Sequence, residues 1–188
     1  MNLPALTHPD LVFINPIART PESLIRLMSE ALYRRHVVDD EAAFIQSVLH
    51  RESEGPTALG EELAVPHGKS SAVRQAAFCI ALFDEPVQWP GLDGDEEVRI
   101  VFLLAIPEAE AGTTHMQLLT ALTSSLTEET LRTDLLAART SEKVISALCV
   151  TEASPETGRT PANRLLIPLL LGIIAATAFI NAGLSWAN

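Results

Sequence analysis

Apolar residues recur at helical spacing in the first fifty positions of the chain. The segment Thr20-Pro21-Glu22 combines an N-cap residue, a first-turn proline and an acid suited to a helix N-terminus, so it predicts the start of a helix. The apolar positions that follow share one face of that helix: Leu24, Leu27, Met28, Ala31 and Leu32. A second amphipathic helix is predicted from Asp39-Asp40-Glu41 through Leu49, ending at His50-Arg51 before the turn-forming Ser-Glu-Gly-Pro.

The middle of the chain combines uninterrupted apolar runs with further helical patterns. Residues 76–83 and 100–106 are apolar throughout, so we expect two strands that are buried on both faces. The loops that bound them are expected to contain Pro86, Pro90, Gly91, Gly94 and Pro107. Three helices are predicted after them: Thr114 to Leu126, Glu128 to Ala138 with Thr127 as its cap, and Glu142 to Leu148 with Ser141 as its cap. Buried strands interleaved with helices predict a layered α/β domain.

Composition divides the chain into two physically different parts. The 188 residues include 13 basic and 24 acidic side chains, a formal net charge of −11, yet the mean hydropathy is +0.22. Every charged residue lies at or before Arg164. We therefore expect one domain over residues 1–152, which is long enough to bury a core. A polar linker over residues 153–164 and an uncharged apolar segment over residues 165–187 are expected to follow it.

The apolar segment is expected to form a transmembrane helix. At about 1.5 Å per residue it would be about 35 Å long, enough to cross a hydrocarbon layer of about 30 Å. Arg159 and Arg164 precede the segment and no charge follows it, so the positive-inside rule predicts a cytoplasmic domain tethered to the inner membrane. The span could be a tail anchor or a remnant of a fused permease. The other alternative is a buried helix of the domain, which the absence of a polar face disfavours.

Charge and cysteine usage exclude several other classes of protein. Recognition of nucleic acid depends on clustered Lys and Arg, which this acidic chain lacks. Cys79 and Cys149 form no CxxC pair, so both are expected to be buried, reduced thiols of a cytosolic domain. The N-terminal residues have no basic region followed by an apolar core, so export is not expected.

The segment with the most chemical content surrounds His67. A short apolar strand candidate, Leu63 to Val65, ends in Pro-His-Gly, so His67 is expected on a sharply turning loop at a strand end. Gly68-Lys69-Ser70 is not a phosphate-binding loop, because the position that requires the first glycine is Leu63. The five histidines form no HxxxH or HExxH pair, and no GxSxG is present. From the pattern alone, a structural role for His67 is favoured over chemistry.

His115 and Arg51 are the other candidates, and each also has a structural interpretation. His115 opens a predicted helix, and Leu118, Leu119 and Leu122 lie on its side of that helix, so the imidazole is expected to face the domain. Its spacing by itself favours a core histidine with one hydrogen bond. Arg51 lies at a predicted helix C-terminus, where the helix dipole favours a cation.

The order of motifs along the chain favours a chemical role for His67, His115 and Arg51 over a structural one. Residues of about 10–150 resemble an enzyme IIA (EIIA) domain of the bacterial phosphoenolpyruvate-dependent sugar phosphotransferase system, in the fructose/mannitol class. Leu-Ala-Val-Pro-His-Gly-Lys, which contains His67, is similar to the phosphohistidine signature of that family. The other motifs occur in the family's order: Arg51-Glu52, Gly-Pro-Thr-Ala-Leu-Gly, Trp89 with Leu92-Asp93-Gly94, Phe-Leu-Leu-Ala-Ile-Pro, and His115-Met-Gln-Leu-Leu.

The resemblance implies a fold, a site and partners. It implies a three-layer α/β fold, with a mixed β-sheet flanked by helices on both sides, and a phosphotransferase in which His67 is the phosphorylated nucleophile. His115 matches the second active-site histidine and Arg51 the active-site arginine, and no cofactor or metal is implied. The phosphoryl donor would be phospho-HPr and the acceptor an EIIB domain, serving a sugar permease EIIC for a fructose-like sugar.

These roles agree with the chemistry of the residues. Neutral imidazole is a nucleophile near physiological pH, and phosphoryl transfer requires mainly positioning and stabilisation of charge on the phosphoryl oxygens. Two alternatives stay open. One is a regulatory protein, like the nitrogen-related EIIA homologues, that binds partners according to its phosphorylation; the other is a degenerate domain whose histidines are structural.

Overall fold

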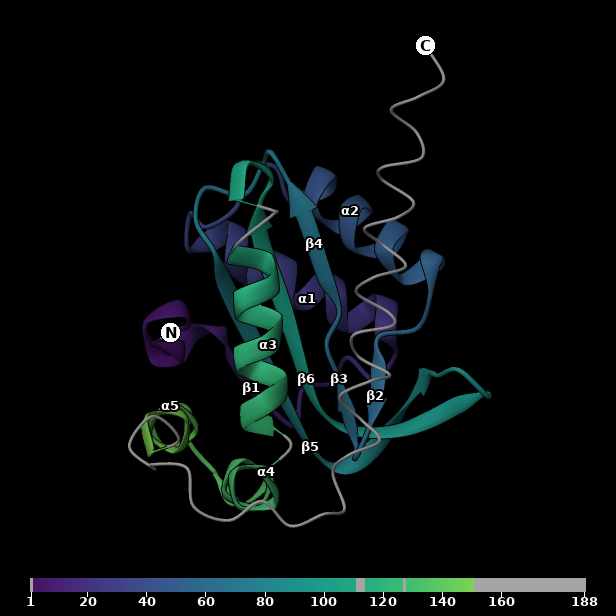
Figure 1. Ribbon diagram of the computed structural model, residues 1–188, viewed down its shortest axis with the longest axis vertical. Helices are drawn as coiled ribbons and strands as arrows, with labels where there is room; N and C mark the ends of the chain where they lie inside the picture. Colours follow the sequence, from purple (N-terminus) through teal and green to yellow (C-terminus); the bar gives the residue numbers. More distant parts are fainter. Residues whose placement is uncertain (1, 111–113, 127, 151–188) are drawn as a thin grey trace. The chain divides into compact units, whose positions relative to one another are not determined.

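The computed structural model describes residues 2–110, 114–126 and 128–150 (Figure 1). The helices are α1 (Pro21–Arg34), α2 (Glu41–Glu54), α3 (Thr114–Leu126), α4 (Glu129–Ala137) and α5 (Ser141–Val150), with short 3₁₀ helices η1 (Leu3–Leu6), η2 (Pro9–Leu11) and η3 (Glu108–Glu110). The strands are β1 (Val12–Ile14), β2 (Ala58–Gly60), β3 (Leu63–Ala64), β4 (His67–Ser70), β5 (Ala77–Pro90) and β6 (Asp95–Pro107). The predicted linker and apolar helix, residues 153–187, lie outside the described residues.

The strands form one mixed sheet in the order β1-β5-β6-β3-β2. β5 and β6 pair antiparallel and form its centre, while β1 runs parallel to β5. β3 and β4 both run parallel to β6, β3 opposite Ile100 and Val101 and β4 opposite residues 104–107. β3 and β4 therefore follow one line along the same neighbour, interrupted at Val65-Pro66.

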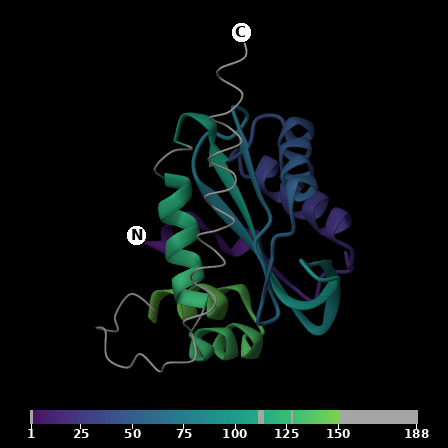
Figure 2. The same cartoon turned by 45° about the vertical axis from the view of Figure 1, so that its right-hand side comes forward.

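Helices cover both faces of this sheet (Figures 1 and 2). Along β5 the side chains alternate between two cores. Ala77, Cys79 and Ala81 pack in the core that contains α1 and α2, whereas Phe78, Ile80 and Leu82 pack in the core that contains α3, α4 and α5. The predicted three-layer mixed α/β fold is confirmed, and the two apolar runs are buried on both faces as expected.

The ends of the helices follow from local hydrogen bonds. Thr20 and Ser23 form a reciprocal capping box at the start of α1, and the Asp40 carboxylate accepts the Ala43 N–H at 3.0 Å at the start of α2. α5 begins at Ser141, and Thr140, not Ser141, caps it by accepting the Lys143 N–H at 3.4 Å. The predicted Thr127 cap lies outside the described residues.

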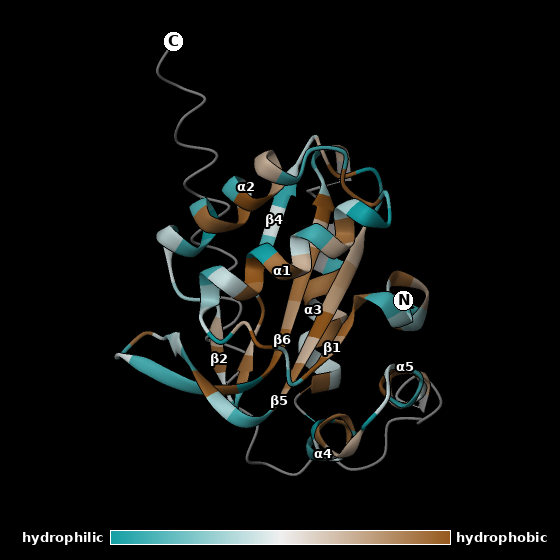
Figure 3. Cartoon of the chain, turned by 180° about the vertical axis from the view of Figure 1, so that it is seen from behind, coloured by the Kyte–Doolittle hydropathy of each residue, from teal (hydrophilic) through white to brown (hydrophobic). Residues whose placement is uncertain are grey.

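The segment between the two apolar runs corrects the sequence prediction. Residues 84–90 and 95–99 were expected in loops, but they extend β5 and β6 into a long hairpin arm, which Figure 3 shows to be largely hydrophilic. Val87, Trp89 and Val98 are buried, whereas the residues on either side of each are exposed or half-buried, which is the alternation of a half-buried strand. The strand can contain Pro86, which has no N–H to donate, because Pro86 lies where the pairing of β5 with β6 shifts register, between Leu82 and Val87.

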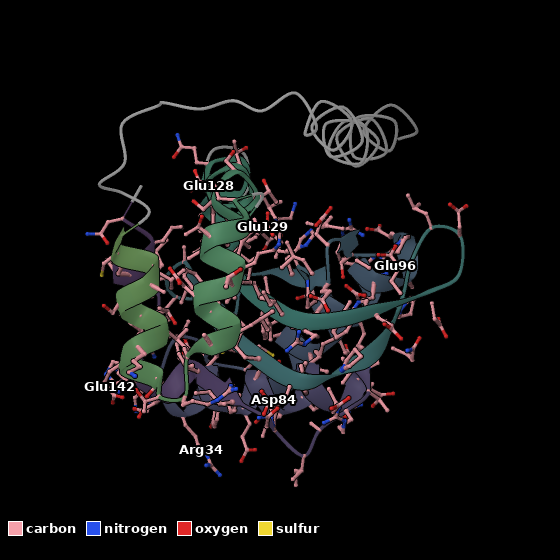
Figure 4. The ribbon with its side chains drawn as sticks, turned by 90° about the horizontal axis from the view of Figure 1, so that it is seen from below. Arg34, Asp84, Glu96, Glu128, Glu129 and Glu142 are labelled. Atoms are coloured by element: carbon pink, nitrogen blue, oxygen red, sulfur yellow. The ribbon has the colours of Figure 1, made fainter. Side chains whose placement is uncertain are left out.

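Seen from below, the labelled charged side chains belong to separate elements of the described structure (Figure 4). Figure 4 places Glu96 on the hairpin arm, apart from Glu128 and Glu129 at the start of α4. Glu96 joins the arm to the next hairpin, because its Oε2 accepts the Gly60 N–H at 3.1 Å. The arm is therefore attached to the β2–β3 hairpin, close to the segment that precedes His67.

Two smaller expectations also have outcomes. Cys79 is a buried free thiol, as predicted, and burial raises its pKa; Cys149 is an exposed free thiol, so the prediction of burial was wrong there. Cys149 lies on the outer side of α5, a helix whose inner positions Val144 and Leu148 fill the core. Within the described residues, no helix is both long and apolar enough to cross a membrane.

Candidate functional site

His67 is the first residue of β4 and not part of a sharply turning loop, which corrects the sequence prediction. Pro66 has no N–H to donate, but its carbonyl accepts the Leu104 N–H at 3.0 Å, so pairing with β6 continues directly after the interruption. A strand begins at His67 because β6 offers a parallel partner there. This places the imidazole on a rigid element, at the break between β3 and β4.

Alternation along β4 sets the direction of the His67 side chain. The backbone of Gly68 lies against α2, where an added Cβ would be 2.5 Å from Ser47 Oγ and 2.6 Å from Val48 Cγ2. Successive strand residues point to opposite faces, so His67 points to the face that α3 covers. Leu63 and Val65 belong to the core on that same face. The imidazole is largely buried, with 8% of the residue exposed.

Both ring nitrogens of His67 have hydrogen-bond partners. Nδ1 lies 3.0 Å from the carbonyl oxygen of Val65. Because a carbonyl only accepts, Nδ1 carries the proton and donates it, which leaves the lone pair of the ring on Nε2. Arg51 donates its Nε–H to that Nε2 at 3.1 Å. The network selects the tautomer in which Nδ1 carries the proton and Nε2 carries the lone pair.

Arg51 is held in place by the end of α2. The helix continues to Glu54, three residues beyond the predicted end, so Arg51 lies in its last turn and not at its terminus. Arg51 also donates an Nη1–H to the carbonyl of Gly55, the residue that caps the helix, at 3.0 Å. These two bonds use two of the five N–H donors of a guanidinium, within the part of the chain that the structure describes. The others can bind the oxygens of a phosphoryl group.

A buried polar network adjoins Arg51. The Trp89 indole N–H donates to Thr57 Oγ1 at 3.3 Å, and the Thr57 hydroxyl donates to Glu52 Oε1 at 2.6 Å. Burial raises the pKa of Glu52, although hydrogen bonds from Thr57 and Trp89 and the Arg51 charge act in the opposite direction. Thr57 was left out of the sequence-derived site. A signal was nonetheless present, since Arg51-Glu52, Gly-Pro-Thr and Trp89 all belong to the ordered motifs.

The structure thus joins two of the three predicted site residues. Arg51 and His67 are in direct contact. His115 lies in the first turn of α3, the helix on the face to which His67 points, but its side chain is outside the described part of the structure. Lys69, the residue two positions after His67, is exposed on β4. No group of three or more His, Cys, Asp or Glu among the described residues is placed to hold a metal ion.

Comparison with known proteins gives consistent matches over this part of the chain. The family model of the phosphoenolpyruvate-dependent sugar phosphotransferase system, EIIA 2, matches residues 5–149. The 2-O-alpha-mannosyl-D-glycerate-specific EIIABC component of Escherichia coli strain K12 is 49% identical over 148 residues, which are 79% of this chain and 22% of that protein. The chain thus spans about a fifth of the length of that relative.

Solved structures share the fold. Nitrogen regulatory protein IIA-Ntr from Neisseria meningitidis has a TM-score of 0.69 and 25% identity, over 77% of this chain and 97% of that one. Enzyme IIAMTL, in its complex with phosphorylated enzyme IIBMTL from Escherichia coli, has a TM-score of 0.63 and 28% identity, over 75% of this chain and 95% of that one. With the match over residues 5–149, the chain belongs to the EIIA 2 family of the phosphoenolpyruvate-dependent sugar phosphotransferase system, a family of phosphotransferase phosphocarriers.

Proposed function

We propose that His67 accepts a phosphoryl group from phospho-HPr and transfers it to an EIIB domain during sugar uptake. The observation that carries the proposal is the pair of contacts on the His67 ring, with Nδ1 bonded to the Val65 carbonyl and Nε2 bonded to Arg51. Together they prepare the nucleophilic nitrogen and place a cation beside it. A core histidine would need neither an arginine at its second nitrogen nor a position at a strand break.

The proposed step balances with these residues alone. The Nε2 lone pair of His67 attacks the phosphorus of the donor phosphohistidine, an N–P bond forms, and the donor N–P bond breaks with its electron pair returning to the donor ring. The proton stays on Nδ1 of His67 throughout, where it is donated to the Val65 carbonyl oxygen. Arg51 shifts its Nε–H from Nε2 to a phosphoryl oxygen, where a cation stabilises the charge of the transferring group. The reverse geometry, with an EIIB side chain as nucleophile, discharges His67.

His115 completes the proposed site. His67 points to the face that α3 covers, and His115 lies in the first turn of that helix. We assign it one N–H donor toward the phosphoryl group. A His115→Ala variant is expected to accept phosphate at a much lower rate; unchanged transfer would remove His115 from the site.

Partners and sugar follow from the relatives. The complex of enzyme IIAMTL with phosphorylated enzyme IIBMTL supports an EIIB acceptor, and EIIC would be the permease that it serves. A fructose-like sugar is one candidate, since a fructose-specific EIIABC component of Bacillus subtilis is 28% identical. The 49% identical relative adds 2-O-alpha-mannosyl-D-glycerate as a second candidate. The carrier itself contacts only phosphohistidine and the phosphoryl acceptor, so the sugar is selected elsewhere.

We place the carrier in the cytoplasm, tethered to the inner membrane by residues 165–187. The support is the uncharged apolar segment itself, with Arg159 and Arg164 before it. The full chain is expected in the membrane fraction, and a variant that ends at Asn163 in the soluble fraction with its phosphorylation intact. A full chain that stays soluble without detergent would contradict the tether.

A regulatory role is the second candidate. It is favoured by the likeness to nitrogen regulatory protein IIA-Ntr and by a nitrogen regulatory protein of Bradyrhizobium diazoefficiens that is 32% identical over 115 residues. The same His67 would then be phosphorylated, but the phosphoryl group would control partner binding and not pass to EIIB. Transfer of label from the chain to an EIIB domain separates the two roles.

The decisive experiment is phosphorylation in a defined system. The full chain is incubated with phosphoenolpyruvate, enzyme I and HPr, and an acid-labile, base-stable phosphate is expected that disappears in His67→Ala. His50→Ala is the matched control, because His50 is an exposed histidine beside Arg51 and should leave the label unchanged. A wild-type chain that takes no label would refute both the carrier and the regulatory role.

A further inference from the structure

Thr57 lies buried where three elements meet, directly before β2. Only 3% of the Thr57 surface is exposed. Its hydroxyl is used in both directions, as acceptor from the Trp89 N–H of the hairpin arm at 3.3 Å and as donor to Glu52 of α2 at 2.6 Å. Only a hydroxyl can accept and donate at one point in this way. Thr57 therefore joins the arm and the end of α2 through a single oxygen atom.

The backbone of Thr57 leads to one nitrogen of His67. The Thr57 carbonyl accepts the Val65 N–H at 3.0 Å, and the Val65 carbonyl faces His67 Nδ1 at 3.0 Å. Val65 lies in the interruption between β3 and β4, where regular pairing with β6 does not hold it. The bond from Thr57 therefore holds the Ala64–Val65 peptide, which directly precedes the Val65–Pro66 peptide whose carbonyl contacts His67 Nδ1.

The side chain of Thr57 leads to the other nitrogen. Glu52, its acceptor, is the neighbour of Arg51 in the last turn of α2, and Arg51 donates to His67 Nε2 at 3.1 Å. The bond between Thr57 and Glu52 joins the two ends of the segment 52–57. Gly55 lies within this segment, and its carbonyl accepts a hydrogen bond from Arg51 at 3.0 Å. Thus the partners of both His67 nitrogens depend on one residue.

On the basis of the proposed phosphoryl transfer, we propose that Thr57 is a positioning residue that holds Arg51 and the Val65 carbonyl on the two nitrogens of His67, with Glu52 and Trp89 as the partners that fix it. It does not touch the phosphoryl group. Loss of its hydroxyl leaves the buried Trp89 N–H and the Glu52 carboxylate without this partner, so both would move toward other polar groups. The expected consequence is a less well placed His67 in a folded chain.

The test compares Thr57→Val, which removes the hydroxyl at nearly constant volume, with Thr57→Ser, which keeps it. In the full chain, kcat for phosphorylation by phospho-HPr is expected to fall about tenfold in Thr57→Val with KM nearly unchanged, since a small misplacement of reacting groups is costly. The Thr57→Ser variant should return kcat to within about twofold of the wild type. The ¹⁵N shifts of His67 should show a smaller population protonated at Nδ1 in Thr57→Val.

A matched control separates positioning from stability. Thr123 is also buried, and its hydroxyl donates to the Leu119 carbonyl of its own helix at 2.7 Å. Thr123→Val should lower the thermal midpoint without changing kcat or the His67 shifts. If Thr57→Val does not fold, Trp89→Phe removes one donor and keeps the aromatic core; its expected fall in kcat is about two- to threefold.

The outcomes distinguish the two proposals. An unphosphorylated wild-type chain would refute the proposed function. A phosphorylated wild type, together with a folded Thr57→Val variant of unchanged kcat and unchanged His67 tautomer, would refute only the positioning role. The positioning role would also be refuted if kcat were as low in Thr57→Ser as in Thr57→Val, or if Thr123→Val lost as much kcat as Thr57→Val.

Discussion

Gly68→Ala is the substitution whose effect the structure defines most sharply. A Cβ on Gly68 would lie 2.5 Å from Ser47 Oγ, 2.6 Å from Val48 Cγ2 and 2.9 Å from Phe44 Cε2. Val48 and Phe44 are fully buried, so they cannot move aside. Restoring an ordinary contact of about 3.4 Å to the valine methyl requires β4 to move from α2 by about 0.8 Å. His67, the preceding residue, must move with it.

Overpacking of this kind costs about 1–3 kcal/mol of unfolding free energy, partly offset by about 0.4–1 kcal/mol from the stiffer unfolded chain. The net loss of about 1–2 kcal/mol corresponds to a thermal midpoint lower by roughly 3–8 °C. The same movement lengthens the Arg51 to His67 hydrogen bond, so phosphorylation by phospho-HPr should slow by at least about tenfold. Thermal unfolding and the initial rate of phosphorylation measure the two effects.

Gly55→Ala is the matched control for this prediction. Gly55 also lies beside Arg51, but an added Cβ would have no atom within 4 Å, and its φ of 162° is extended backbone open to any residue. Its unfolding free energy should change by less than about 0.5 kcal/mol. If Gly68→Ala matches Gly55→Ala in thermal midpoint and in phosphorylation rate, the close approach of β4 to α2 cannot be what positions His67.

Three further substitutions test other parts of the argument. Arg51→Lys removes the planar fork that spans His67 and Gly55, so phosphorylation should slow by about a hundredfold, and an unchanged rate would exclude the proposed role of Arg51. Because the pKa of Glu52 is raised, the folded state keeps a proton above pH 4.5 that the unfolded state has already lost, so wild-type stability should fall as the pH rises through that range. Glu52→Gln should lack this fall, and urea-unfolding stabilities of the two proteins that change in parallel between about pH 4 and 7 would contradict it. Glu62→Gly should raise the thermal midpoint by roughly 2 °C, because Glu62 has a φ of 62° in a two-residue hairpin loop that favours glycine. A lower midpoint would show that the ion pair of Glu62 with Arg99, at 3.8 Å, contributes more than the backbone strain costs.

Local patterns predicted the helices and the central strands well. The caps at Thr20 and Asp40 and the apolar faces behind them are properties of short segments, and the structure confirms both helices. The hairpin arm was missed because Pro86 and Pro90 are usually loop residues. Only the register shift between β5 and β6 and the burial of Trp89 against the body of the domain make this segment a strand.

Local patterns in the sequence predicted the five helices and the two buried strands, and the ordered motifs indicated the family, its three-layer fold and the three candidate site residues. The sequence could not determine what their contacts would be. Arg51 and Thr57 reach His67 from segments that meet only when α2 packs on β4 and Val65 bonds back to Thr57. Hydrogen bonds act over about 3 Å, whereas sequence patterns describe neighbours along the chain. The tautomer of His67 and the network behind it therefore depend on contacts that form only when the chain folds.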